Sequence, residues 1–428
     1  MEILNKKKVK KIAIVGVGYV GLPLALELHR HFKISCYDFS LSRVGQLNKG
    51  IDENNENNLK KINKKNIFFS NQKKILKNND IFIICVPTPI LKNNKPDLKM
   101  IKDASELVSE YIKPKSIVIY ESTFYPGLTE EICLPILQKK SGLKINKDFY
   151  IGYSPERINP ADKKHNLKNV VKIISASDKK ALNIIDYVYS KICKSGLHKA
   201  NSIKIAEGSK IIENIQRDIN IALMNELSIV FDKLNIPFQD VLKAAKTKWN
   251  FLDFSPGLVG GHCIGVDPYY LTYKSKRVNY IPKVILSGRK INDKMHFIIF
   301  KKIFNECKKN KIDPKKSSVI QLGVTFKENC SDFRNSKSIE LYKLLKSSFK
   351  KVDLYDPIVN RAKLLEKENI KLLNTLLNRK YDFVIIPVLH NLFKNEIDFK
   401  KIIKKNSQIF SIKPLNNKSI KQNKILYL

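Results

Sequence analysis

The chain has 428 residues, enough for two or three domains of ordinary size. A hydrophobic fraction of 43% permits ordinary buried cores, and no apolar stretch approaches the roughly 18 residues that a membrane span requires. The basic N-terminal segment runs directly into a strand pattern, so it does not have the form of a signal peptide. We therefore expect a cytoplasmic protein with no membrane partner.

A formal net charge of +39 is typical of proteins that bind nucleic acids. Here, however, the lysines are spread along the whole chain, greatly outnumber the arginines and stand beside abundant asparagines. This distribution indicates a biased surface composition rather than a patch built to bind phosphates. We expect no nucleic-acid partner, and a basic nucleic-acid-binding protein is kept as one alternative.

The seven cysteines are scattered, and no two of them form a CxxC pair. An odd number without a framework spacing predicts reduced thiols in a reducing compartment and no structural metal site. A single cysteine in a special setting is then a candidate nucleophile. The cysteines are Cys36, Cys85, Cys133, Cys193, Cys263, Cys307 and Cys330.

In the first half of the chain, strands alternate with helices from Lys11 to about Ala200, the pattern of a parallel, doubly wound sheet. The turn Pro87-Thr88-Pro89 ends one of these strands, and the polar stretch Asp52–Lys65 predicts a loop or a distorted helix. We expect strands at Lys11–Gly16, Ile34–Asp38, Asp80–Val86 and Ser116–Tyr120, and a helix at Gly21–Arg30.

Beyond Ala200 the pattern changes, because apolar residues recur at helical spacing from Asn201 to about Phe231 and predict one long helix. A second helix is expected at Leu286–Lys308. Strands of a second α/β domain, with helices between them, are expected at Ser317–Leu322, Val352–Tyr355 and Tyr381–Val388.

The fold class that we predict is α/β, with two Rossmann-like, doubly wound parallel-sheet domains joined by a long central helix. The first Rossmann-like domain would span residues 1–200, and a central helical domain that carries a dimer face would span 201–308. The second Rossmann-like domain would span 309–428. A homodimer through the long helix is the expected assembly.

The sequence Gly16-Val17-Gly18-Tyr19-Val20-Gly21 fits G-x-G-x-x-G between a strand and a helix. The first glycine permits a tight turn, the second lets the backbone approach a pyrophosphate, and the third lets helix and strand pack closely. Asp38 ends the next strand, where a carboxylate holds ribose hydroxyls and repels a 2′-phosphate, so NAD is favoured over NADP. The alternative is a glycine-rich turn beside an ordinary aspartate. The expected cofactor contacts are Gly16, Gly18, Tyr19, Val20, Gly21, Asp38, Arg43 and Thr88.

The segment Pro256–Pro268 places four glycines around one thiol, Cys263. Such a thiol is able to attack an aldehyde, and the thiohemiacetal that results is a good hydride donor. Asp267 lies close enough in sequence to reach the thiol or a water beside it. The alternative is a small buried cysteine in a tight turn. For His262, which directly precedes the thiol, we expect a packing or hydrogen-bonding role.

Lys210 and Asn214 lie at i and i+4 of the predicted long helix and share a face, which Asp218 continues. An ammonium and an amide side by side are suited to hold a developing alkoxide and to position a water. The alternative is a solvated polar stripe.

Together these motifs resemble the UDP-glucose and UDP-N-acetylhexosamine 6-dehydrogenases over nearly the full length. Lys248-Trp249-Asn250-Phe251-Leu252 and then Pro256–Tyr270 are similar, almost residue for residue, to the branch that makes UDP-N-acetylhexosaminuronic acids for surface polysaccharides, such as the Vi-antigen type. The UDP-glucose enzymes typically carry Pro-Lys where this chain has Gly265-Val266. The resemblance implies UDP-GlcNAc or UDP-GalNAc as substrate, with UDP-ManNAc and UDP-glucose as alternatives.

The resemblance implies that the domain at 1–200 binds NAD and that the domain at 309–428 binds the UDP-sugar. It also implies roles for single residues. Cys263 would be the nucleophile, while Lys210, Asn214 and Asp267 would handle the oxyanion, the thioester and the water. Thr123 and Glu156 match positions that flank the nicotinamide and the hydrolytic water, and Arg334 would reach the cofactor. The implied substrate contacts are Glu156, Arg157, Lys210, Asn214, Leu252, Phe254, Gly260 and Lys327, and no metal is implied.

The implied reaction is a four-electron oxidation of a primary alcohol to a carboxylate, which consumes two NAD and one water. Two further rival interpretations stay open. A β-hydroxyacid-type dehydrogenase also pairs a Rossmann domain with a Lys/Asn helix but needs no cysteine loop. A non-catalytic nucleotide-sugar-binding protein is expected to have lost motif residues.

Overall fold

The computed structural model describes residues 9–53, 59, 62, 65–156, 166–376, 379–420 and 425–428. It divides into two compact units. The first comprises Met1–Glu213 with Tyr269–Tyr280, and the second comprises Asn214–Pro268 with Ile281–Leu428.

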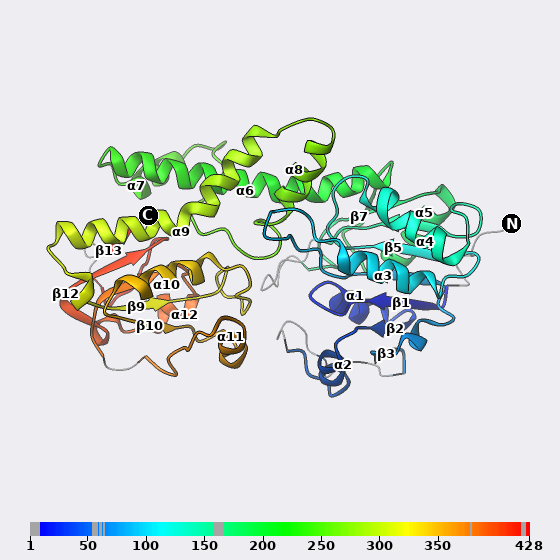
Figure 1. Cartoon of the computed structure of the whole chain (residues 1–428), viewed down its shortest axis with the longest axis horizontal. Coiled ribbons are helices and arrows are strands. Elements are labelled where there is room, and N and C mark those ends of the chain that lie inside the picture. Colours follow the sequence, from blue (N-terminus) through cyan, green and yellow to red (C-terminus); the bar gives the residue numbers. More distant parts are fainter. Residues whose placement is uncertain are drawn as a thin grey trace. The chain divides into compact units, whose positions relative to one another are not determined.

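The first unit contains an eight-stranded sheet with the order β3-β2-β1-β4-β5-β6-β7-β8. Helices connect its strands, as Figure 1 shows in blue to cyan. The strands are β1 (Lys11–Val15), β2 (Lys33–Tyr37), β3 (Ile67–Ser70), β4 (Ile81–Ile84), β5 (Ile117–Tyr120), β6 (Tyr150–Tyr153), β7 (Lys172–Ala176) and β8 (Leu197–Lys199). The helices are α1 (Gly21–Leu28), α2 (Leu41–Asn48), α3 (Lys99–Ser109), α4 (Leu134–Ser141) and α5 (Lys179–Ser190).

The chain order reverses between β1 and β4, because β1 pairs in parallel with both β2 and β4. In open α/β sheets the crevice at the carboxyl ends of such a pair is where ligands bind. The turns after β1, β2, β4 and β5 all lie at this edge, so the predicted cofactor residues gather there.

One strand pair in the first unit departs from the predicted parallel arrangement. β6 and β7 are antiparallel, with Gly152 opposite Ala176 and Tyr153 opposite Ser175. β7 therefore begins at the edge of the sheet where β6 ends. This reversal has a chemical consequence, because it brings the first residue of β7 to the carboxyl edge.

The second unit contains a five-stranded, all-parallel sheet with the order β10-β9-β11-β12-β13. Helix α10 packs against α9 over a core that includes Met295, Ile299 and Leu345. The strands are β9 (Ser318–Leu322), β10 (Lys351–Tyr355), β11 (Tyr381–Ile386), β12 (Ile403–Ser411) and β13 (Ile425–Tyr427). The helices are α7 (Phe238–Ala245), α9 (Lys283–Lys309), α10 (Lys337–Ser348), α11 (Arg361–Glu368) and α12 (Asn391–Asn395).

The predicted long helix is α6 (Ile203–Lys233), and it runs from the first unit into the second, as does α8 (Asp267–Arg277). The predicted fold class, two α/β sheets and a long central helix, is confirmed. Strands β12 and β13 were not predicted, and much of Asp52–Lys65 lies outside the described residues. The division into three domains stays a prediction.

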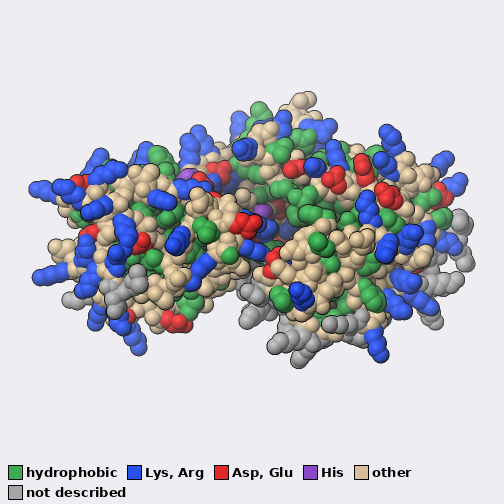
Figure 2. Space-filling view, turned by 60° about the horizontal axis from the view of Figure 1, so that its bottom comes forward, with side chains coloured by type: hydrophobic (Ala, Val, Ile, Leu, Met, Phe, Trp, Pro, Cys, Tyr) green, Lys and Arg blue, Asp and Glu red, His purple; other side chains and the backbone are tan. Residues whose placement is uncertain are grey.

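The surface agrees with the dispersed charge of the sequence. Figure 2 shows lysine and arginine side chains scattered over the visible face of each unit rather than gathered on one element. None of the helices in the described part of the chain combines the length and the apolar character that crossing a bilayer requires.

Candidate active site

The glycine-rich turn between β1 and α1 has the geometry that its sequence predicts. Gly16 has φ of +91°, and a Cβ on Gly21 would lie 1.9 Å from the Gly16 carbonyl oxygen. At Gly18, by contrast, a Cβ would meet no atom within 4 Å. The first and third glycines are therefore required by the turn and by helix packing, while the middle one leaves backbone open to a ligand.

Asp38 fixes this turn from the end of β2. One carboxylate oxygen accepts the Val17 N–H at 3.0 Å, and the other accepts the Ser40 N–H at 3.0 Å. The side chain is half-buried, so it can still meet a ligand from the crevice. Asp38 thus supports the turn, and it is also the carboxylate predicted to meet the ribose.

Arg43, which we predicted to contact the cofactor, donates hydrogen bonds to groups of the protein itself. Its Nε and Nη2 each donate to the Val17 carbonyl at 3.1 Å, and its Nη1 donates to Asp52 at 2.9 Å. Both side chains are buried. The guanidinium therefore stabilises the glycine-rich turn through the Val17 carbonyl. Its contact with the cofactor stays a prediction.

The remaining predicted residues of the first unit follow the next strands. Thr88 and Thr123 are half-buried in the turns after β4 and β5, and Tyr19 and Val20 are half-buried in the glycine-rich turn. Lys210, near the start of α6, is 9% exposed. Arg157 lies outside the described residues.

A buried cluster of charged groups lies at the carboxyl edge of β5 and β6. Its cation, Lys172, was not predicted from the sequence. Lys172 Nζ donates to Glu156 at 2.8 Å and to Glu121 at 3.2 Å, and the Tyr189 hydroxyl donates to the other oxygen of Glu121. The antiparallel register of β6 and β7 explains this contact. Continued beyond the pair Tyr153 and Ser175, it places Glu156 opposite Lys172. A lysine at the start of an otherwise apolar strand was the only signal in the sequence.

The cluster combines two carboxylates with one ammonium away from water. Burial raises the pKa of Glu121 to about 7, against the opposing charge of Lys172. Burial alone would lower the pKa of Lys172, but the charges of Glu121 and Glu156 outweigh it and raise that pKa. The lysine is thus held as a cation between two buried carboxylates.

In the second unit, Cys263 is the one exposed thiol among the seven cysteines, all of which lie in described parts of the chain. The six others are buried, and burial raises the pKa of Cys133 and Cys193 to about 12 and that of Cys307 to about 11. Such thiols are poor nucleophiles near neutral pH. Exposure therefore separates Cys263 from the rest and argues against the alternative of a small buried cysteine.

The glycines before Cys263 are required by close packing against the segment 323–335. A Cβ on Gly260 would lie 2.6 Å from the Asn335 carbonyl oxygen, and one on Gly261, which has φ of +79°, would lie 2.8 Å from the Phe326 ring. The loop therefore lies directly on Phe326, and no larger side chain fits at these two positions.

Asp267 begins α8 and turns its carboxylate to Asn214. The Asn214 amide donates to Asp267 at 2.5 Å, and both side chains are buried. The Asp267 N–H donates to the Cys263 carbonyl at 2.8 Å, which closes the turn around the thiol. Asn214 and Asp267, which sequence spacing alone could not connect, are thus brought together beside the Cys263 turn.

Asp218 follows Asn214 one turn later on α6, but its carboxylate binds side chains of α9. Its carboxylate accepts from Arg289 at 2.7 Å and from Asn292 at 2.7 Å, and all three side chains are buried. Asp218 therefore ties α6 to α9 rather than facing a ligand.

Desolvation lowers the pKa of His262 to about 4, assisted by Arg334, in keeping with the packing role predicted for His262.

The other predicted residues of the second unit are dispersed around this loop. Leu252 is exposed and Phe254 is half-buried, and both precede the cysteine turn. Arg334 forms a forked ion pair with Asp332 through its Nε and Nη2. Lys327 is half-buried in the turn after β9.

Three profiles of one family match successive parts of the chain. They are the NAD binding domain of the UDP-glucose/GDP-mannose dehydrogenase family at residues 10–193, the central domain at 204–294, and the UDP binding domain at 320–416. The chain belongs to the UDP-glucose/GDP-mannose dehydrogenase family. It is an NAD-dependent UDP-sugar dehydrogenase, and the prediction of NAD is confirmed.

Relatives of this dehydrogenase match nearly end to end. It is 46% identical to Protein CapL of Staphylococcus aureus, over 95% of this chain and 96% of that protein. It is 47% identical to the UDP-N-acetyl-D-glucosamine 6-dehydrogenase of Salmonella typhi, over 90% of this chain and 91% of that protein. Among solved structures, the UDP-D-ManNAc dehydrogenase of Pyrococcus horikoshii aligns with a TM-score of 0.86 at 27% identity, covering 97% of this chain and 98% of that chain.

Proposed function

We propose that the enzyme oxidises the C6 hydroxymethyl group of a UDP-N-acetylhexosamine, UDP-GlcNAc or UDP-GalNAc, to the carboxylate, with Cys263 as covalent nucleophile. The observation that carries the proposal is the single exposed thiol, which lies in a turn closed by Asp267. An aldehyde bound at that thiol would not leave between the two oxidations. The predicted residues of the dinucleotide turn supply the site for NAD, which accepts a hydride in each oxidation when bound.

The cysteine turn and helix α6 supply groups suited to the covalent steps. Cys263 would add to the C6 aldehyde as a thiohemiacetal, which then becomes a thioester when hydride is lost. The Asn214–Asp267 pair, with Lys210 one helical turn earlier, would hold the developing oxyanion and exchange its proton.

Glu156 is suited to the hydrolysis of the thioester. A buried carboxylate that is held in place by an ammonium at 2.8 Å is suited to act as the base for a water. Thr123, in the turn after β5, would help to position that water beside the nicotinamide. Leu252, Phe254, Gly260 and Lys327 would hold the sugar nucleotide, and Arg157 stays a predicted contact.

The identity of the sugar is supported by the relatives. Proteins named UDP-N-acetyl-D-glucosamine 6-dehydrogenase are 45–47% identical, whereas a UDP-N-acetyl-D-mannosamine dehydrogenase of Methanococcus vannielii is 33% identical. UDP-ManNAc and UDP-glucose are therefore the secondary candidates. The product, a UDP-linked uronic acid, would serve surface polysaccharide synthesis in the cytoplasm.

A homodimer is part of the proposal. Helix α6 exposes Ile212, Leu223 and Val230, large apolar side chains on a helix that a partner copy would cover.

The test is NADH formation with NAD and each of UDP-GlcNAc, UDP-GalNAc, UDP-ManNAc and UDP-glucose. We expect kcat/KM to be higher by at least about tenfold for UDP-GlcNAc or UDP-GalNAc than for the other two. Preference for UDP-glucose or UDP-ManNAc would contradict the choice of sugar. Binding of UDP-GlcNAc without any NADH would instead favour a non-catalytic nucleotide-sugar-binding protein.

A further inference from the structure

The turn after β9 carries Lys327 and has no G-x-G-x-x-G motif, yet its backbone is fixed by buried polar groups. Asp356, just beyond β10, accepts the Val324 N–H at 2.9 Å and the Ile358 N–H at 3.0 Å. Asp38 makes the same two kinds of bond in the first unit, to the turn after β1 and to the residue two positions on. The two sheets thus repeat one arrangement of turn and carboxylate.

The two carboxylates differ in what else they meet. Asp38 is half-buried at a nucleotide-binding edge, whereas Asp356 is fully buried and has His390 against it, with Nε2 at 3.1 Å. In the second unit an imidazole therefore contacts the same carboxylate oxygen that accepts the Val324 N–H. The turn after β9 is thus built around an internal partner.

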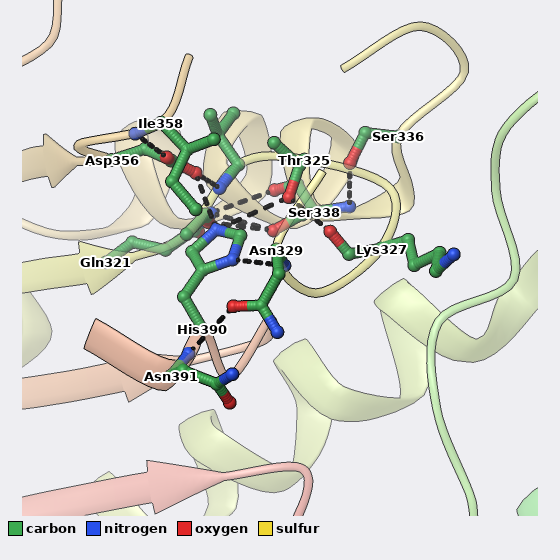
Figure 3. Close-up of polar contacts among 12 residues, drawn as sticks. Gln321, Thr325, Lys327, Asn329, Ser336, Ser338, Asp356, Ile358, His390 and Asn391 are labelled. Carbon is green, nitrogen blue, oxygen red and sulfur yellow. Dashed lines mark hydrogen bonds and ion pairs between the residues drawn. The ribbon is translucent and has the colours of Figure 1, made fainter. Parts of the chain in front are cut away.

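His390 bridges the turn at both of its ring nitrogens. Its Nδ1 accepts the backbone N–H of Asn329 at 2.8 Å, so in the neutral ring the proton is on Nε2, which faces Asp356 and the Thr325 hydroxyl at 3.4 Å. The Thr325 hydroxyl in turn donates to the Lys327 carbonyl at 2.8 Å. Figure 3 shows the imidazole at the centre of these bonds, with the Lys327 side chain pointing away from the cluster.

Asn329 has φ of +55°, in the left-handed region that asparagine tolerates, and it is held at two points. Its side-chain oxygen accepts the Asn391 N–H at 2.9 Å, so residues 390 and 391 hold Asn329 through both its backbone and its side chain. Between the anchors at Val324 and Asn329 lie Phe326, which packs under the cysteine turn, and Lys327.

We propose that His390 is a positioning residue for the UDP-sugar: it locks the segment Val324–Asn329 and so presents the Lys327 ammonium to the anionic diphosphate. The inference rests on the proposed function for the role of Lys327 and adds the residue through which Lys327 is held. His390 touches neither substrate nor cofactor and acts only through the segment.

The test measures UDP binding by calorimetry and the KM values of the full-length enzyme for UDP-GlcNAc and NAD. We expect His390→Ala to raise the Kd of UDP and the KM of the UDP-sugar by at least about tenfold, with the KM of NAD changed by less than about twofold. His29→Ala is the matched control, because His29 is also buried but lies in the first unit, bonded to the Leu26 carbonyl at 2.6 Å. It should leave UDP binding unchanged.

Two conservative variants separate the bonds of the imidazole. Asparagine can place an acceptor near the position of Nδ1, so His390→Asn should restore UDP binding to within about threefold of the wild type. Glutamine reaches Asp356 but leaves the Asn329 N–H without its acceptor, so His390→Gln should stay close to His390→Ala. If the alanine variant does not fold, the difference in UDP binding between His390→Asn and His390→Gln tests the proposal.

A double-mutant cycle tests whether His390 acts through the lysine. In a Lys327→Met background, His390→Ala should weaken UDP binding by less than about threefold. Equal losses in both backgrounds, or UDP binding within about twofold of the wild type in folded His390→Ala, would overturn the proposal. Wild-type enzyme that binds UDP but forms no NADH would instead count against the proposed function.

Discussion

Lys172 and Glu156 lie opposite each other at the edge of the sheet where β6 ends and β7 begins, with Nζ 2.8 Å from the Glu156 carboxylate. Both side chains are buried, and Glu121 is the second carboxylate on the same ammonium. The pair exists because β7 runs antiparallel to β6. A structural lysine thus holds in place the carboxylate that we assign to thioester hydrolysis.

The first prediction concerns this lysine. In Lys172→Met, Glu156 loses the buried ammonium that donates to it at 2.8 Å, so it is no longer positioned to activate water. We expect a rapid burst of NADH followed by steady-state turnover at least about 100-fold slower, with a covalent adduct detectable by intact mass. Lys199→Met is the control, because Lys199 pairs with Asp186 at the surface. Turnover of Lys172→Met within about threefold of the wild type would contradict the assignment.

The second prediction isolates Cys263 from the six buried thiols. Cys263→Ser keeps the size of the side chain but offers a hydroxyl that ionises far less readily. The variant should bind NAD and the UDP-sugar normally and lose steady-state turnover by roughly 10³-fold or more. Serine at any of the six buried positions should change stability at most. A Cys263→Ser enzyme within about tenfold of the wild type would leave Cys263 as a packing residue.

The third prediction concerns cofactor choice. Asp38→Ala removes a carboxylate that favours ribose hydroxyls and repels a 2′-phosphate, so the preference for NAD over NADP should narrow by at least about tenfold. Stability should also fall, because two backbone N–H groups lose their acceptor. Ser40→Ala removes the cap of α2 without a change in charge and serves as the control. Wild-type enzyme that uses both cofactors equally would show that the assignment of Asp38 is wrong.

The fourth prediction is a pH dependence of stability set by Glu207 on α6. Its carboxylate accepts from Gly127 and from Thr129, but burial raises its pKa to about 7 from 4.5. The pKa of Glu207 is higher in the folded than in the unfolded protein, so the protonated carboxyl group contributes stability. This contribution is fully present below pH 4.5 and is lost as the pH rises through 7.

Glutamine does not titrate. From pH 5 to pH 8 the free energy of unfolding of Glu207→Gln should therefore rise by about 2 to 3 kcal/mol relative to that of the wild type. Thermal unfolding midpoints of both proteins at the two pH values provide the measurement. Glu110→Gln, at an exposed position, is the control. A difference in midpoint between variant and wild type that does not change with pH would argue against a protonated Glu207.

Local signals predicted much of the fold and part of the site. The glycine-rich turn, the long helix and the cysteine turn each depend on neighbours in sequence, so spacing alone predicted them. The Asn214–Asp267 bond and the Lys172 cluster depend on register and on turns between distant segments. Asp218 shows the limit most clearly, because its helical spacing was read correctly while its partners, Arg289 and Asn292, come from α9.

The turn after β9 illustrates the same limit. It repeats the geometry of the first turn without its glycine motif, and the histidine that holds it lies more than 60 residues downstream in sequence. No local pattern connects His390 to Lys327. Only the order of strands β9 and β11, which are neighbours in the sheet, brings the two segments together.

The most direct test of the central claim is the ratio of NADH to uronic acid formed by the wild-type enzyme with UDP-GlcNAc or UDP-GalNAc, with a carbonyl-trapping reagent present. A thiol that retains the aldehyde until the second oxidation requires two NADH for each uronic acid and no trapped aldehyde. We expect this ratio to hold from the first turnover onward. One NADH per turnover, with free aldehyde captured by the reagent, would contradict covalent retention at Cys263 and with it the proposed four-electron reaction.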